Sequence, residues 1–163
     1  MALTQAERAA FLDRYEAGPG LLRSAWTAVP VEARQWRPSA GKWSAHEVVV
    51  HCADSETFAA TRIRLLLAEP EPLIVGYDEN EWARAFDYHR SDIDLALDVV
   101  AQVRSHTASM FRRLDDPAWD KVGRHTHSGV YGTGNWLRNY AEHLEVHAAQ
   151  IQRNLNDWSA GPA

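Results

Sequence analysis

The stretch Tyr140-Ala-Glu-His-Leu-Glu-Val-His-Ala-Ala-Gln-Ile151 decides how this chain folds. Its two histidines, His143 and His147, are four residues apart and therefore lie one turn apart on the same face of a helix. An apolar row runs directly beside them and consists of Leu137, Ala141, Leu144, Ala148, Ile151 and Leu155. Together the two rows form one wide inward face, which is typical of a helix packed against several neighbours.

The histidine row itself continues through Trp136, Tyr140 and Gln150. Its imidazoles border a region where a protein core normally holds leucine or isoleucine. A buried polar group costs roughly 1–3 kcal/mol unless it finds a partner. We therefore expect something to satisfy these two imidazoles, and a metal ion is a strong candidate.

Composition narrows the class of protein. A chain of 163 residues predicts one domain, residues 1–163, with a single core. The net charge of -5 argues against a nucleic-acid-binding surface, and no apolar run approaches the roughly 18 residues of a membrane span. The single Cys52 and an N-terminus without signal-peptide features favour a cytoplasmic location.

Helical patterns cover four long segments, at about residues 4–26, 44–68, 91–114 and 133–158. Thr4-Gln-Ala-Glu7 and Ser44-Ala-His-Glu47 have the form of capping boxes that begin the first two helices, and Thr133 or Asn135 caps the last. Gly18-Pro19-Gly20 interrupts the first pattern, which predicts either a kinked helix or two short ones.

The connections between these segments are long. Residues 69–90 contain a short helix that begins near Asp78, and residues 121–133 are interpreted as a loop rich in Gly and His. No strand-like alternation of any length occurs. The sequence therefore predicts an all-α fold: a four-helix bundle of up-down-down-up or related topology, with long connections and short extra helices.

In such a bundle, side chains of facing helices can converge on one interior point. His51, in a mixed and partly apolar stripe of the second helix, could meet His143 and His147 there. Three neutral imidazoles suit Zn²⁺, Ni²⁺ or Fe²⁺, and three protein ligands leave a coordination position open, as in a catalytic site. Spacing arguments alone cannot bring residue 51 to residue 143.

Two motifs resemble those of the DinB-like superfamily of metal-binding four-helix bundles. They are Gly41-Lys-Trp-Ser-Ala-His-Glu-Val-Val-Val-His51, of the form W-S-x-x-E-x-x-x-H, and the Tyr140–Ile151 stretch, of the form H-x-x-x-H-x-x-Q. The resemblance implies that His51, His143 and His147 hold a divalent metal. The family name derives from a DNA-damage-inducible gene and does not imply DNA binding.

Members of that family include thiol-dependent transferases and isomerases as well as metal-dependent hydrolases. The resemblance therefore implies a metal-dependent enzyme, either a small-thiol S-transferase or a related hydrolase, in which the metal activates a thiol or a water. Its implied partners are a small-molecule substrate, a low-molecular-weight thiol and a second copy of the chain in a homodimer. The alternative is a non-catalytic bundle that binds metal or a small ligand and acts through dimerisation.

The catalytic residues stay open, with three candidates. Glu47 is either the capping-box carboxylate or an acid/base group near the metal. Tyr140 is either a buried aromatic or a hydroxyl that reaches the site. His127, like His125, is either part of a solvated loop or a proton carrier.

Two further side chains are candidates for substrate binding. An inward-facing Arg62 needs an anionic partner, which is either a protein carboxylate or a substrate carboxylate. Gln150 either hydrogen-bonds a ligand or is a plain core amide. Asp54 could hold a histidine ring or replace a ligand. The remaining histidines are expected at the surface or in loops: His46, His89 and His106.

Overall fold

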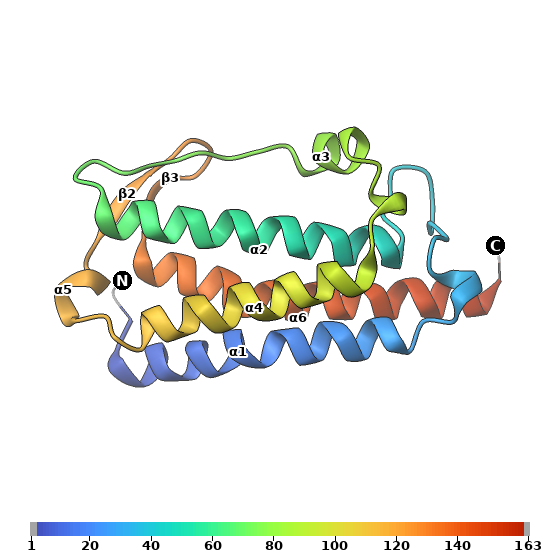
Figure 1. The fold of residues 1–163 in the computed structure, drawn as a ribbon, viewed down its shortest axis with the longest axis horizontal. Coiled ribbons are helices and arrows are strands. Elements are labelled where there is room, and N and C mark those ends of the chain that lie inside the picture. Colours follow the sequence, from blue (N-terminus) through green and yellow to red (C-terminus); the bar gives the residue numbers. More distant parts are fainter. Residues whose placement is uncertain (1–2, 162–163) are drawn as a thin grey trace.

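The computed structural model describes residues 3–161, and four long helices form its bundle (Figure 1). These helices are α1 (Gln5–Thr27), α2 (Ala45–Ala68), α4 (Ile93–Phe111) and α6 (Thr133–Ala160). The shorter elements are the helices η1 (Val31–Ala33), α3 (Glu79–Ala85), η2 (Tyr88–Arg90) and α5 (Asp116–Trp119), with strands β1 (Leu73–Ile74), β2 (Val122–His125) and β3 (Gly129–Gly132). The predicted all-α four-helix bundle is confirmed.

The helices run up-down-down-up. In Figure 1, α1 and α6 point one way along the bundle while α2 and α4 point the other way. Helix α1 packs against α6 and α4, and α2 packs against α4 and α6, so α1 and α2 lie across a diagonal. Each long helix therefore has one parallel and one antiparallel neighbour. Helices α2 and α6, which carry the three histidines, are antiparallel neighbours.

This topology explains the long connection after α2. Because α2 and α4 are parallel, the chain must return along the whole bundle before α4 can begin, and residues 69–92 do so across the outside of α2 (Figure 1). We call residues 69–92 the crossover. Its predicted short helix is present as α3, with Asp78 accepting hydrogen bonds from the N–H groups of Asn80 and Glu81.

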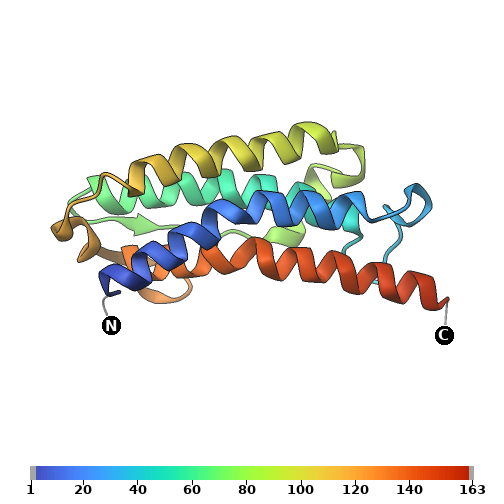
Figure 2. The ribbon, with the colours of Figure 1, turned by 90° about the horizontal axis from the view of Figure 1, so that it is seen from below.

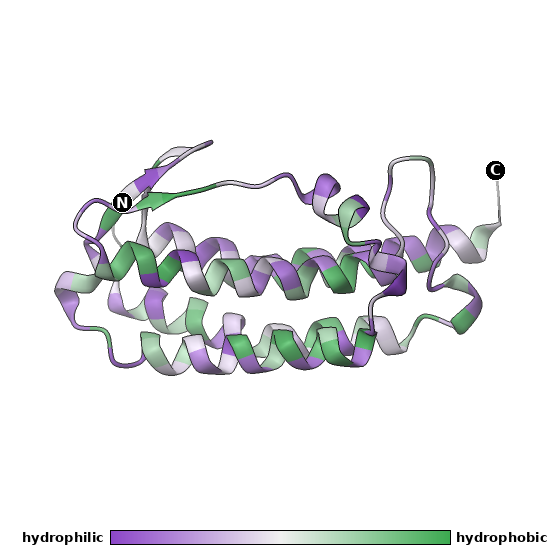
Figure 3. Cartoon of the chain, turned by 45° about the horizontal axis from the view of Figure 1, so that its top comes forward, coloured by the Kyte–Doolittle hydropathy of each residue, from purple (hydrophilic) through white to green (hydrophobic). Residues whose placement is uncertain are grey.

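The interpretation of residues 121–133 as a plain loop is wrong. Strands β2 and β3 pair as an antiparallel hairpin, and β1 of the crossover pairs parallel with β2 through Leu73 opposite Arg124. Strand β1 is visible as an apolar segment of the crossover (Figure 3). The strands are two to four residues long, which is too short for alternation to show in the sequence. Strands β2 and β3 pair across a short turn, and only the pairing of β1 with β2 joins segments far apart in the chain.

The predicted capping boxes are present. The Ser44 side chain accepts a hydrogen bond from the N–H of Glu47, whose carboxylate accepts in turn from the N–H of Ser44. Thr4 and Glu7 do the same at α1. The prediction that Thr133 or Asn135 is the cap of α6 is wrong: Gly132 is the N-cap, Thr133 is the first helical residue, and the Asn135 side chain accepts from the N–H of Gly132. No helix within residues 3–161 combines the length and apolar character that crossing a bilayer demands.

Helix α1 continues through Gly18-Pro19-Gly20 as one helix whose axis bends part-way along (Figure 2). Pro19 has no N–H, so the carbonyl of Tyr15 loses its partner within the helix. The guanidinium of Arg104, from α4, donates to that carbonyl instead, at 2.6 Å. A Cβ on Gly18 would lie 2.5 Å from Nη1 of Arg104. Pro19 and Gly18, which disfavour a helix, therefore leave a free carbonyl and the space for a fully buried arginine.

This geometry predicts opposite effects for two neighbouring substitutions. Gly18→Ala is expected to lower the free energy of unfolding by about 1–3 kcal/mol, because the new methyl group overlaps Arg104 and crowds Leu144. Gly20→Ala is the matched control: a Cβ added there would have nothing within 4 Å, so helix propensity raises stability by up to about 1 kcal/mol. Urea denaturation of both variants measures the difference, and equal effects would contradict this role of Gly18.

Candidate metal centre

The structure brings His51, His143 and His147 together inside the bundle. Their candidate ligand atoms all lie within 4.8 Å of one another. The ring centroids are 4.8 Å apart for His51 and His147, 5.6 Å for His51 and His143, and 4.6 Å for His143 and His147. The antiparallel contact between α2 and α6 closes the gap that helical spacing could not close.

A buried carboxylate orients His143. Nδ1 of His143 donates to Oε1 of Glu56 at 2.9 Å, and the same oxygen accepts from Arg104 at 2.6 Å. Burial alone would raise the pKa of Glu56, but the charge of Arg104 and the hydrogen bond from His143 hold that pKa below its usual value. Glu56 is therefore an anion. Since His143 carries its proton on Nδ1, the lone pair of Nε2 is left for a ligand.

Gln150 orients the second histidine of α6. Nδ1 of His147 donates to the amide oxygen of Gln150 at 2.9 Å, which again leaves Nε2 with its lone pair. Gln150 was a candidate for substrate binding. Its amide oxygen has a protein partner in His147, and the part of Gln150 in substrate binding stays a prediction.

His51 is the most deeply buried of the three. Its Nδ1 is buried without a hydrogen-bond partner among residues 3–161, and the ring of Trp43 packs 4.7 Å from its own. Burial, together with His147 and His143, lowers the pKa of His51 to about 2. Burial and His143 lower the pKa of His147 to about 4. Both rings are therefore neutral at physiological pH, as metal ligation requires.

These residues fit a divalent metal. Two imidazoles present oriented Nε2 lone pairs, and the third has a buried nitrogen that lacks a partner in the described part of the chain. A set of three neutral imidazoles suits Zn²⁺, Ni²⁺ or Fe²⁺ and leaves room for a further ligand.

Arg104 ties this arrangement to all four long helices. From α4 it donates to Glu56 of α2, to the carbonyl of Tyr15 in α1 and to the carbonyl of Tyr140 in α6, each at 2.6 Å. Neither Glu56 nor Arg104 was a candidate from the sequence. The signal was present: each occupies a position in an otherwise apolar helical row, Val49-Cys52-Glu56-Ala59-Ile63 in α2 and Leu97-Val100-Arg104-Ala108-Phe111 in α4.

The catalytic candidate Glu47 makes its contacts away from the three histidines of the candidate metal centre. Besides capping α2, its buried carboxylate accepts from Nε of Arg37 at 2.8 Å and lies 3.4 Å from Nε2 of His89. The structural reading of Glu47 therefore holds, and the acid beside the histidines is Glu56. Asp54 is likewise engaged, because it accepts from the Tyr88 hydroxyl at 2.6 Å.

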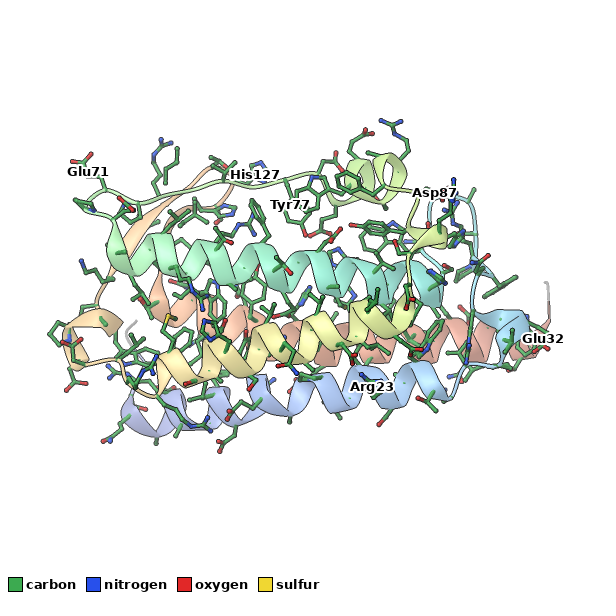
Figure 4. All side chains as sticks on the ribbon, viewed as in Figure 1. Arg23, Glu32, Glu71, Tyr77, Asp87 and His127 are labelled. Atoms are coloured by element: carbon green, nitrogen blue, oxygen red, sulfur yellow. The ribbon has the colours of Figure 1, made fainter. Side chains whose placement is uncertain are left out.

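Of the two remaining catalytic candidates, Tyr140 contacts one of the three histidines of the candidate metal centre and His127 lies on the hairpin. The ring of Tyr140 packs 5.6 Å from that of His143, and its hydroxyl accepts from Arg62 at 3.3 Å. His127 is exposed on the hairpin and lies against Gly76 of the crossover, where Figure 4 shows it beside Tyr77. The expectation of a surface position for His46 is wrong: it is buried and donates to the carbonyl of Ser91.

Residues 14–151 match the family model of the DinB superfamily. The chain belongs to this superfamily. A relative in Oceanobacillus iheyensis, named as a candidate metal-dependent hydrolase, is 30% identical over 152 residues, which cover 91% of this chain and 87% of the relative. A Bacillus licheniformis protein with the same description is 30% identical over 141 residues, covering 82% of this chain and 77% of that protein.

Two solved structures share the fold of this chain. YfiT from Bacillus subtilis, described as a probable metal-dependent hydrolase with an unusual four-helix bundle topology, superposes with a TM-score of 0.90 at 23% identity. That match covers 97% of this chain and 91% of YfiT. A mycothiol-dependent maleylpyruvate isomerase superposes with a TM-score of 0.70 at 11% identity, over 88% of this chain and 60% of the isomerase. These likenesses establish the fold.

The contrast between the two acids of α2 is testable. Glu56→Gln removes the anion that fixes His143, so the affinity for Zn²⁺ is expected to fall by about 10–100-fold. Glu47→Gln is the matched control, because it weakens the cap and the contact with Arg37 but touches none of the three histidines. Competition with a chromophoric chelator measures both affinities. An equal loss in both variants would contradict the role of Glu56.

The metal-free protein is expected to lose stability as the pH falls below about 6.5. The folded-state pKa values of His51 and His147 lie below the ordinary value of 6.5, so the unfolded chain binds protons that the folded chain excludes. The contribution of these two histidines to the free energy of unfolding is therefore fully present above pH 6.5 and is lost progressively as the pH falls towards 4. Unfolding midpoints in EDTA from pH 8 to 5 measure this, with a shallower slope expected for His147→Gln. The exposed His106→Gln control should keep the wild-type slope.

Proposed function

We propose that this protein is a metal-dependent enzyme whose divalent ion is held by His51, His143 and His147. The observation that carries the proposal is the convergence of these three imidazoles, two of them already oriented by Glu56 and Gln150. When bound, the ion supplies Lewis acidity that lowers the pKa of a water or a thiol towards neutrality.

The protein's own residues hold the site ready for this chemistry. Glu56 and Gln150 fix the tautomers of the two α6 histidines, and Trp43 covers the ring of His51. Burial raises the pKa of Tyr140, so its phenol keeps its proton. Because its oxygen accepts from Arg62, that proton is left to be donated to a substrate oxygen.

Two versions of the reaction follow from the nucleophile. Hydrolysis by an activated water is supported by the two relatives at 30% identity, both named as candidate metal-dependent hydrolases. Transfer of a small thiol is supported by the shared fold with a mycothiol-dependent isomerase. We place hydrolysis first, because the closer sequence similarity is to the hydrolases.

His147→Ala tests the site and the activity together. The variant is expected to lose most of its bound metal and its activity, since two imidazoles hold a divalent ion far less tightly than three. Metal is measured by mass spectrometry on untagged protein, and activity on a panel of small esters and amides and on thiol addition to 1-chloro-2,4-dinitrobenzene. His106→Ala, an exposed histidine of α4, is the control.

The outcomes separate the alternatives. Full metal content in His147→Ala would refute the assignment of the site. A wild-type protein that binds metal but is inactive on both panels would favour the non-catalytic bundle that acts through dimerisation. Activity on only one panel would decide between water and thiol as the nucleophile.

A further inference from the structure

Arg62 of α2 is half-buried and, among the described residues, donates hydrogen bonds only to neutral oxygens. Its Nε and Nη2 donate to the carbonyl of Val75 at 3.0 and 2.5 Å, and its Nη1 donates to the Tyr140 hydroxyl at 3.3 Å. Within residues 3–161 it forms no ion pair, whereas Arg37 and Arg104 both pair with carboxylates. The positive charge of Arg62 is thus unmatched, and each terminal nitrogen retains a second N–H.

Aromatic rings hold this guanidinium in place. Its central carbon lies 4.3 Å from the ring centroid of Phe58 and 5.5 Å from that of Tyr77. Tyr77 packs in turn against Phe58 and Trp82, with centroids 5.2 and 4.3 Å away. Arg62 is therefore fixed between α2 and the crossover, where Figure 4 labels Tyr77. A charge held in advance binds a ligand at a smaller entropic cost.

Two phenol hydroxyls near Arg62, those of Tyr77 and Tyr140, keep their protons and can donate hydrogen bonds to a ligand. The Tyr77 hydroxyl is buried near that of Ser55 and has no hydrogen-bond partner within the described residues. Burial raises the pKa of both Tyr77 and Tyr140, so both phenols stay protonated. The acids that follow Tyr77, Asp78 and Glu79, form no ion pair with Arg62. An unmatched guanidinium beside two phenol donors is a set of groups suited to an oxyanion.

This set adjoins the three histidines. Tyr140 contacts both, since its ring packs against His143 while its hydroxyl meets Arg62. We propose that the substrate carries an oxyanion group, a carboxylate or a phosphoryl group, that pairs with Arg62 and accepts hydrogen bonds from Tyr77 and Tyr140. The position of the reacting end at the histidines rests on the proposed function, whereas recognition of the anion needs no metal.

Binding to metal-free protein tests the recognition of the anion. Butanoate and butylphosphonate are titrated against butanamide, with NMR shifts as the readout. Wild-type protein is expected to bind at least one of the two anions about 10-fold or more tightly than the amide, because a charged hydrogen bond is lost with the amide. Arg62→Met should abolish this preference. Arg64→Met, on the same helix but bonded to Ala60 and Thr107, should keep it.

Whichever of the two anions binds more tightly shows whether the site prefers a carboxylate or a phosphoryl group. Equal binding of anions and amide by the wild type would overturn the proposal, as would a preference that persists in Arg62→Met. Tyr77→Phe provides a second test that does not rely on Arg62→Met folding. It removes a buried hydroxyl without a partner, so the unfolding midpoint should not fall, while the affinity for the anion should drop several-fold. If Arg62→Met does not fold, unchanged anion affinity in Tyr77→Phe overturns the proposal.

Metal content measured on the same variants keeps this inference separate from the proposed function. Protein that binds metal through its histidines but shows no preference for anions would refute the class of substrate alone. Protein that prefers anions through Arg62 but takes up no metal would refute the proposed function alone.

Discussion

The ion pair between Arg104 and Glu56 is the interaction on which the candidate metal centre depends. Both side chains are completely buried, and burial of an ion pair commonly costs as much as the pairing returns. Nε of Arg104 and Oε2 of Glu56 even lack partners among residues 3–161. Such a pair is a poor source of stability, so we infer that its value lies in orienting His143. A carboxylate in this environment stays ionised and fixes which imidazole nitrogen bears the proton.

All four long helices contribute to that orientation, although only α2 and α6 carry the histidines. Helix α4 supplies Arg104, and α1 supplies the carbonyl that Pro19 leaves unpaired and the space that Gly18 leaves open. A break in helix propensity in α1 is therefore a requirement of the site. The apolar core of the bundle thus encloses a buried polar network that reaches all four long helices.

The crossover follows from the same topology. Parallel neighbours α2 and α4 force the chain to return along the outside of α2, and this segment carries Val75, Tyr77 and Trp82 to the side of α2 where Arg62 lies. The hairpin of β2 and β3 then pairs with β1 and secures the crossover. The proposed anion-binding region is thus formed by α2 and α6 together with one wall that the crossover supplies.

Local patterns in the sequence were sufficient for the helices, their capping boxes and the shared face of His143 and His147, because helical periodicity and capping act over a few residues. The stripe of the second helix made His51 a candidate third ligand, but spacing could not bring it to His143, and the resemblance of the two motifs supplied that assignment. Only the tertiary structure decided that Glu56 rather than Glu47 contacts His143, that Gln150 accepts a hydrogen bond from His147, and that residues 122–132 form a hairpin. The contact between Glu56 and His143 depends on which helices become neighbours and how they are oriented, whereas the hairpin and the contact of Gln150 each lie within a short segment. Contacts between residues far apart in the chain are set by topology, and local periodicity does not encode it.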